Sequence, residues 1–171
     1  MNRRSLLAVA AISVPPLSAG CLSDLGTTLS NTSSGCQDPG RSNELDYEVR
    51  DAGELKDLWD GAVLVTDLDE IDRLDERVLG SEDETWIRET QFSTDVVVGV
   101  QVGSSGQSSD IEILGVERDG ETLFVYSCIE SSGMTDDWVA YTRLLRIAHD
   151  GDPPTAVVLT HREGGEETVY E

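Results

Sequence analysis

Apolar residues alternate with other residues along the second half of the chain, which predicts β-strands from Thr94 onward. Alternate residues of a strand lie on one face of it. In the first run those residues are Val96, Val98, Val100 and Val102. The alternation resumes at Ile111 and Ile113, after a connection at 103–109 that is rich in Gly and Ser. Such a composition predicts a turn between two strands.

A further set of strands is predicted after residue 119. Asp119-Gly120 lies between two apolar runs, which is the strongest hairpin signal in the chain. The later runs are 123–128, 139–147 and 155–160, and the turn 150–154 joins the last two. Because short connections join neighbouring antiparallel strands, we expect an antiparallel sheet.

The preceding part of the chain has helical periodicity. Leu55, Leu58 and Trp59 recur at the spacing of one helical face. A second face with the same spacing consists of Leu68, Ile71, Leu74 and Val78. Asp67 is the expected N-cap of this second helix and Gly80 its stop. The predicted fold class is therefore α+β: an antiparallel sheet of five or six strands with one or two covering helices, following a signal peptide and a flexible stalk.

The first twenty residues, Met1 to Gly20, have the three parts of an export signal. Arg3 and Arg4 open it, an apolar run follows at 6–14, and small residues precede Cys21. The apolar run is too short to span a bilayer, which takes about 20 residues. The paired arginines, followed by two leucines, resemble the twin-arginine motif, and that resemblance implies export of an already folded protein.

Cys21 is the expected lipidation site. The sequence Leu17-Ser18-Ala19-Gly20-Cys21 resembles a lipobox, in which the cysteine becomes the lipid-bearing N-terminus. Plain secretion is the alternative, because Ser18 and Gly20 also suit an ordinary cleavage site. The chain has three cysteines, so lipidation of Cys21 leaves Cys36 and Cys128 as an even pair. We therefore expect attachment to the extracytoplasmic side of the cell membrane through a lipid anchor.

Four regions follow from these features: a signal peptide at 1–20, the lipidated cysteine and a Ser/Thr-rich stalk at 21–41, a globular domain at 42–163 and an acidic tail at 164–171. Asn31 begins an N-x-[ST] pattern, so it is a candidate glycosylation site. Cys36 and Cys128 are expected to form a disulfide in an oxidising compartment. The alternative is a buried thiol at Cys128 with Cys36 free.

The charge of the chain points to a salt-rich habitat. There are 34 acidic and 12 basic residues, giving a formal net charge of -22, and Lys56 is the only lysine. A field of this sign repels phosphate backbones, so we expect no nucleic-acid partner. A surface covered with carboxylates stays hydrated in concentrated salt, where screening acts over roughly 3 Å at molar ionic strength. We interpret the acidity as halophilic.

No catalytic constellation stands out. His149 and His161 flank the turn 150–154, where they could approach each other across a hairpin and bind a metal with Asp150 or Asp152. Solvated histidines are the preferred interpretation, so no metal, cofactor or catalytic residue is expected. The segment 103–106 lacks the strand-turn-helix context of a nucleophile elbow. Three aromatic residues are candidates either for a binding surface or for the core: Trp86, Trp138 and Tyr141.

From Ala52 onward the order of elements resembles the C-terminal domain of the protease-complex subunit PrcB. The matching parts are an aromatic-bearing helix at 54–59, a Phe-led strand at 92–102, paired strands at 111–116 and 123–128, and a Tyr-bearing strand at 141–147. The resemblance implies a small, non-catalytic surface domain that assists other exported proteins. It supplies no catalytic residues.

These observations favour a membrane-anchored binding or accessory module with a protein partner on the cell surface. One alternative is a small hydrolase or metal enzyme that uses His149 and His161. Another is the solute-binding component of a transporter, although about 120 domain residues are few for two closing lobes.

Overall fold

The computed structural model describes Cys36 and residues 44–52, 60–74 and 79–171, with the backbone alone for 106–109 and 131–137. The chain divides into two units, Met1–Ser33 and Ser34–Glu171. The first unit, with Cys21 and Asn31, lies outside the described residues, as does the helix predicted around Leu55. No helix among the described residues is long and apolar enough to cross a membrane.

Among the described residues of the second unit strands dominate, and two short helices interrupt them. The elements are β1 (Tyr47–Asp51), β2 (Gly61–Val65), the 3-10 helix η1 (Leu68–Leu74), α1 (Ser81–Arg88), β3 (Asp95–Asp119), β4 (Thr122–Ala148), β5 (Ala156–Glu163) and β6 (Glu166–Tyr170). Along the sheet the order is β2-β3-β4-β5-β6, and β1 also pairs with β4. The α+β prediction therefore holds only in broad form, since the described part of the chain is predominantly β.

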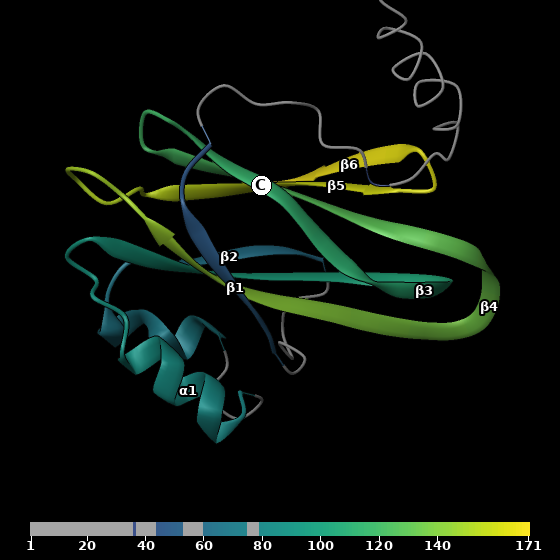
Figure 1. Ribbon diagram of the computed structural model, residues 1–171, viewed down its shortest axis with the longest axis horizontal. Coiled ribbons are helices and arrows are strands. Elements are labelled where there is room, and N and C mark those ends of the chain that lie inside the picture. Colours follow the sequence, from purple (N-terminus) through teal and green to yellow (C-terminus); the bar gives the residue numbers. More distant parts are fainter. Residues whose placement is uncertain (1–35, 37–43, 53–59, 75–78) are drawn as a thin grey trace, which may run out of the picture. The chain divides into compact units, whose positions relative to one another are not determined.

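The long strands β3 and β4 belong to two layers. The ends farther from the β3–β4 hairpin, around Val98 and Leu145, pair with each other. In this layer β3 also pairs with β2, and β4 also pairs with β1. The ends nearer to the β3–β4 hairpin, around Val116 and Val125, form a second layer in which β4 also pairs with β5, and β5 with β6. Figure 1 shows β3 and β4 bending from the layer beside β1 and β2 to the layer beside β5 and β6.

The described residues contain two buried apolar clusters. The larger cluster unites inward-facing residues of both strand layers, including Val98, Leu145 and Leu159. The smaller one packs the helices against the other face of the first layer, and its buried residues include Val65, Ile71, Leu74, Trp86, Ile87, Val97 and Leu144. The predicted valine face at 96–102 is confirmed, because all four valines are buried in the larger cluster.

The helical region differs from the prediction. Asp67 does cap η1, since its Oδ1 accepts the N–H groups of Asp69 at 2.8 Å and Glu70 at 3.2 Å. Residues 68–74 form a 3-10 helix rather than an α-helix, and its two buried residues, Ile71 and Leu74, lie three apart, which suits three residues per turn. Residues 75–78 lie outside the described part of the chain.

Gly80, predicted to end a helix, instead begins α1. Its carbonyl oxygen accepts the N–H groups of Asp83 and Glu84, both at 3.0 Å. The sequence pattern missed α1 because it is eight residues long and buries only two apolar side chains, Trp86 and Ile87. Its acidic first turn and Arg88 in its last turn match the helix dipole and are the signals that could have revealed it.

The predicted turn at 103–109 is wrong. The backbone of β3 continues through this segment, with register shifts relative to β4 on either side of Gly106 and on either side of Ser108. Irregularities of this kind bend a strand and strengthen its twist. The Gly- and Ser-rich segment therefore lies where β3 passes from one layer to the other, and the two predicted strands are one.

The predicted antiparallel pairing after residue 139 is also wrong. In the described strands, β5 pairs in parallel with Thr122–Ile129 of β4, not with the run before the turn 150–154. The physical reason is that β1 and β3 already occupy both edges of β4 at 143–147. The chain must therefore cross to the other layer to find a free edge.

The sequence pattern did not predict three of the described strands, but it did predict one hairpin. β1 and β2 lie in the region predicted to be helical, and β6 lies within the predicted acidic tail. The Asp119-Gly120 hairpin is confirmed: Asp119 pairs with Thr122, and Gly120 has a φ of 59°, a left-handed conformation that glycine adopts without strain.

Candidate functional site

Trp138 is the most exposed large apolar residue among those described, with 61% of its surface accessible. It lies on β4, where that strand bends between the layers, and the adjacent Val139 is 43% exposed. The indole rests on the backbone of Gly103: a Cβ atom added to this glycine would lie 2.1 Å from Cζ2 of Trp138. Only glycine leaves room for this packing, so Gly103 holds an otherwise solvent-facing ring in place.

The same stretch of β3 fixes two carboxylates. The N–H of Gly103 donates to Oδ1 of Asp60 at 2.6 Å, and Asp60 immediately precedes β2. The hydroxyl of the next residue, Ser104, donates to Oε1 of Glu163 at the end of β5. Gly103 therefore contacts both an exposed indole and a carboxylate, and its neighbour holds a second carboxylate.

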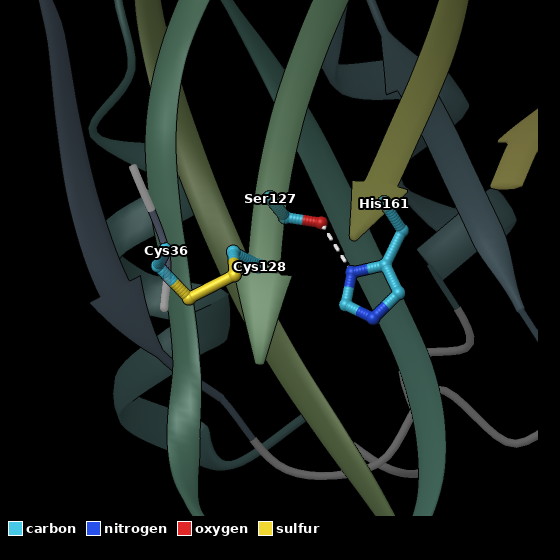
Figure 2. Close-up of a disulfide and its surroundings, with 4 residues drawn as sticks. All are labelled: Cys36, Ser127, Cys128 and His161. Atoms are coloured by element: carbon cyan, nitrogen blue, oxygen red, sulfur yellow. Dashed lines mark hydrogen bonds between the residues drawn. A yellow bond between two sulfur atoms is a disulfide. The ribbon is translucent and has the colours of Figure 1, made fainter. Parts of the chain in front are cut away.

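Beneath this surface a serine and a histidine form a buried pair. Oγ of Ser127 and Nδ1 of His161 are 2.8 Å apart (Figure 2). Ser127 is 1% exposed and His161 is 5% exposed. Nε2 of His161 is buried and has no hydrogen-bond partner among the described residues. Because neither side chain reaches the surface, the pair cannot meet a substrate in this conformation, although nucleophile and base are in hydrogen-bond reach.

Burial lowers the pKa of His161, and the negative charges of Glu163 and Asp60 act in the opposite direction. Burial also raises the pKa of Tyr170 on β6, to which the same two carboxylates contribute. An imidazole favours its neutral form when it is buried, because desolvation penalises the charged form. The interior beside β5 thus keeps His161 neutral, while Asp60 and Glu163 supply negative charge close to it.

Cys36 and Cys128 form the predicted disulfide, with their Cα atoms 5.5 Å apart. Cys128 and Ser127 are consecutive on β4, so their side chains point to opposite faces, as Figure 2 shows. The disulfide therefore lies on the outer face of the second layer, and the Ser127–His161 pair on its inner face. The bond attaches the beginning of the second unit to the central strand β4.

The two histidines do not meet. His149 follows the end of β4. His161 lies within β5, five residues after its first residue, Ala156. This part of β5 alone extends over about 17 Å at 3.3 Å per residue. Both are buried rather than solvated, so that interpretation was wrong. Both ring nitrogens of His149 lack a hydrogen-bond partner in the described part of the chain. No grouping of His, Cys, Asp and Glu among the described residues fits a metal ion.

The three candidate aromatic residues have different environments. Trp86 is buried beneath the guanidinium of Arg146, which lies 4.1 Å from its ring centroid. Tyr141 is half-buried against the larger cluster. Trp138 alone of the three projects into solvent. The sequence therefore offered Trp138 only as one of three candidates, and it did not indicate Gly103, Asp60 or Glu163 as neighbouring residues.

A surface depression of about 400 Å³ lies between β1 and α1, lined by Arg50, Ser81, Glu82, Thr85, Trp86 and Glu89. The guanidinium of Arg50 already has acidic partners. Its Nε donates to Oδ1 of Asp83 at 2.7 Å, and its NH2 lies 3.4 Å from Oε2 of Glu82. These ion pairs connect β1 with α1. The depression is thus explained by the packing of the helix against the strand layer.

Comparisons of this chain with protein-family models, curated proteins and solved structures found no match.

Proposed function

We propose that the protein is a membrane-anchored, extracytoplasmic lipoprotein that acts as a non-catalytic binding or accessory module for another exported protein. The observation that carries the proposal is the indole of Trp138, exposed and held against Gly103. Aromatic residues are enriched at protein interfaces, because a large rigid ring provides contact area at a small cost in conformational entropy.

The remaining geometry supports a module that binds rather than one that reacts. The Ser127–His161 pair is buried, and His149 and His161 lie on different elements, the first after the end of β4 and the second within β5. A hydrolase that used these residues would need them at the surface. The resemblance to the PrcB domain, which accompanies other exported proteins, supports the same proposal.

The disulfide supports the export part of the proposal. Disulfides form and persist mainly in extracytoplasmic compartments, and of the three cysteines in the sequence Cys21 is the one that takes no part in the Cys36–Cys128 bond. The cysteine that would follow the proposed leader is therefore not used by this disulfide.

The anchor is tested by replacing Cys21 with Ser in the producing cell. The variant is expected in the medium, or in the membrane with its leader uncleaved. Replacing Arg3 and Arg4 by Lys should block export altogether. Normal processing and full membrane retention of the Cys21→Ser variant would refute the lipid anchor, whereas unchanged export of the double Lys variant would assign the leader to the general secretion pathway.

The binding role is tested by photo-crosslinking on intact cells. A benzophenone amino acid at Val139, beside Trp138, is expected to capture a defined protein. The matched control is the same probe at Leu68 on η1, which is 38% exposed and comparable to Val139 at 43%. Equal yields at both positions, or no protein captured at Val139, would count against this surface as the binding site.

A further inference from the structure

Trp138 and Asp60 together suggest what the surface would bind. Both contact Gly103: the indole packs on its backbone, and Oδ1 of the carboxylate accepts its N–H at 2.6 Å. An aromatic ring and an anionic group thus both contact one residue, and Trp138 is mostly accessible to solvent. One N–H occupies only part of the accepting capacity of a carboxylate, which can take about four hydrogen bonds.

We propose that Trp138 and Asp60 form a receptor for a positively charged side chain, so that the partner presents an Arg- or Lys-containing segment. This inference rests on the proposed function and gives the chemical nature of its partner. A cation over the face of an indole is attracted by the ring's quadrupole. A guanidinium can stack on the ring and at the same time donate hydrogen bonds to a carboxylate.

The chain already contains one such arrangement in its own fold. The guanidinium of Arg146 lies 4.1 Å from the ring centroid of Trp86, and its NH1 donates to Oε2 of Glu48 at 2.9 Å. Indole, guanidinium and carboxylate are thus combined within the domain. At Trp138 the indole and the carboxylate are present, and the cation would come from the partner.

The charge of the protein favours a basic partner. The formal net charge is -22, and Glu163, which Ser104 holds, adds a second carboxylate near Asp60. Ion pairs between exposed groups are strongly screened in molar salt, so charge alone would give little selectivity there. Stacking on Trp138 acts at contact distance and would persist, which makes the ring the necessary element of the receptor.

The test measures binding of fluorescent peptides to the full-length protein in detergent at 0.2 and 2 M KCl. The probes are a Gly-Arg repeat, a Gly-Lys repeat and a Gly-Glu repeat of equal length. We expect the Arg peptide to bind most tightly and the Glu peptide not to bind. Trp138→Ala should weaken Arg-peptide binding about tenfold at both salt concentrations, a change of roughly 1.4 kcal/mol.

Two further variants separate the receptor from the fold. Asp60→Asn keeps an oxygen acceptor for the N–H of Gly103 but removes the charge, and should weaken binding mainly at 0.2 M KCl. Gly103→Ala should displace the indole, because its Cβ would clash with the ring, and should weaken binding as much as Trp138→Ala. In the Trp138→Ala background the same glycine substitution should have no further effect. Leu68→Ala, at another exposed apolar residue, is the matched control.

Arg-peptide binding that is unchanged in Trp138→Ala, with the thermal midpoint preserved, would overturn the inference. So would tighter binding of a neutral glucan oligosaccharide than of the Arg peptide, because that result would assign the ring to sugar stacking. If a protein is still captured at Val139 in either case, only the basic character of the partner is wrong. If no protein is captured there, the proposed function itself fails.

Discussion

His161 is a titratable group that the folded chain keeps neutral. It is 5% exposed, its Nδ1 contacts Oγ of Ser127 at 2.8 Å, and burial lowers its pKa. The unfolded chain, with an ordinary histidine pKa of about 6.5, binds a proton that the folded chain resists. Stability that depends on the neutral ring is therefore complete above about pH 6.5 and is lost as the pH falls below it.

We expect the free energy of unfolding to decrease between pH 7 and pH 5, and His161→Gln to remove much of that decrease. The measurement is urea unfolding at constant KCl concentration across this range. His149→Gln serves as the control, because it leaves His161 and its contribution in place. The same pH dependence in wild type and His161→Gln would show that the buried ring does not govern acid stability.

The residues of the candidate site differ in how far the sequence could predict them. Trp138 was a candidate because an indole in an acidic, strand-rich chain either joins the core or forms a surface. Its neighbours Gly103 and Asp60 are 43 residues apart in the chain, and they meet because Gly61 pairs with Gln101 in the β2–β3 register. No local pattern specifies that register, since β2 itself was not predicted.

At the scale of elements, the disulfide links two residues that are far apart in the chain. Cys36 and Cys128 are separated by 92 positions. In the chain-entropy model a loop of this length contributes roughly 4 to 5 kcal/mol by restricting the unfolded chain. Cys36→Ser should lower the free energy of unfolding by up to about this amount.

Urea titrations of the oxidised protein, the reduced protein and Cys36→Ser test this expectation. The last two should agree if the cross-link alone matters, because both lack it and both retain the buried sulfur of Cys128. A stability of Cys36→Ser equal to that of the oxidised protein would mean that the bond adds nothing to the fold. A reduced protein more stable than Cys36→Ser would point instead to a role for the Cys36 side chain itself.

The elements that were predicted correctly are those whose signals are local. The valine face of β3 and the Asp119-Gly120 hairpin depend on neighbouring residues and on one glycine with positive φ. The pairing of β5 with the first half of β4 depends instead on which strand edges remain free. Likewise, 103–109 has the composition of a turn but forms the bend of a continuous strand, a distinction decided by the packing of two layers.

For the whole molecule the dominant property is charge. With a formal net charge of -22, self-repulsion in dilute buffer extends over about 30 Å at 0.01 M salt, but only about 3 Å at 1 M. A compact state concentrates this repulsion, and unfolding relieves it. We expect the thermal midpoint, followed by circular dichroism, to rise from 0.05 to 3 M KCl.

A variant with fewer charges provides the control. Asp72, Glu112 and Glu130 are exposed, and replacing them by Asn, Gln and Gln should raise the midpoint at 0.05 M KCl and flatten its dependence on salt. A midpoint that stays constant or falls with KCl in the wild type would contradict the halophilic interpretation. Equal salt dependence in the two proteins would mean that these carboxylates do not contribute to it.

The shared strands β3 and β4 determine how the domain can open. Each runs through both layers, so one layer cannot come apart while the other stays intact without breaking the backbone pairing in the middle of a strand. Native-state hydrogen exchange should therefore give the same opening free energy for the amide of Val98 in one layer and the amide of Val125 in the other. Two layers that unfold independently would give two different values. Two layers in space would then behave as one cooperative unit.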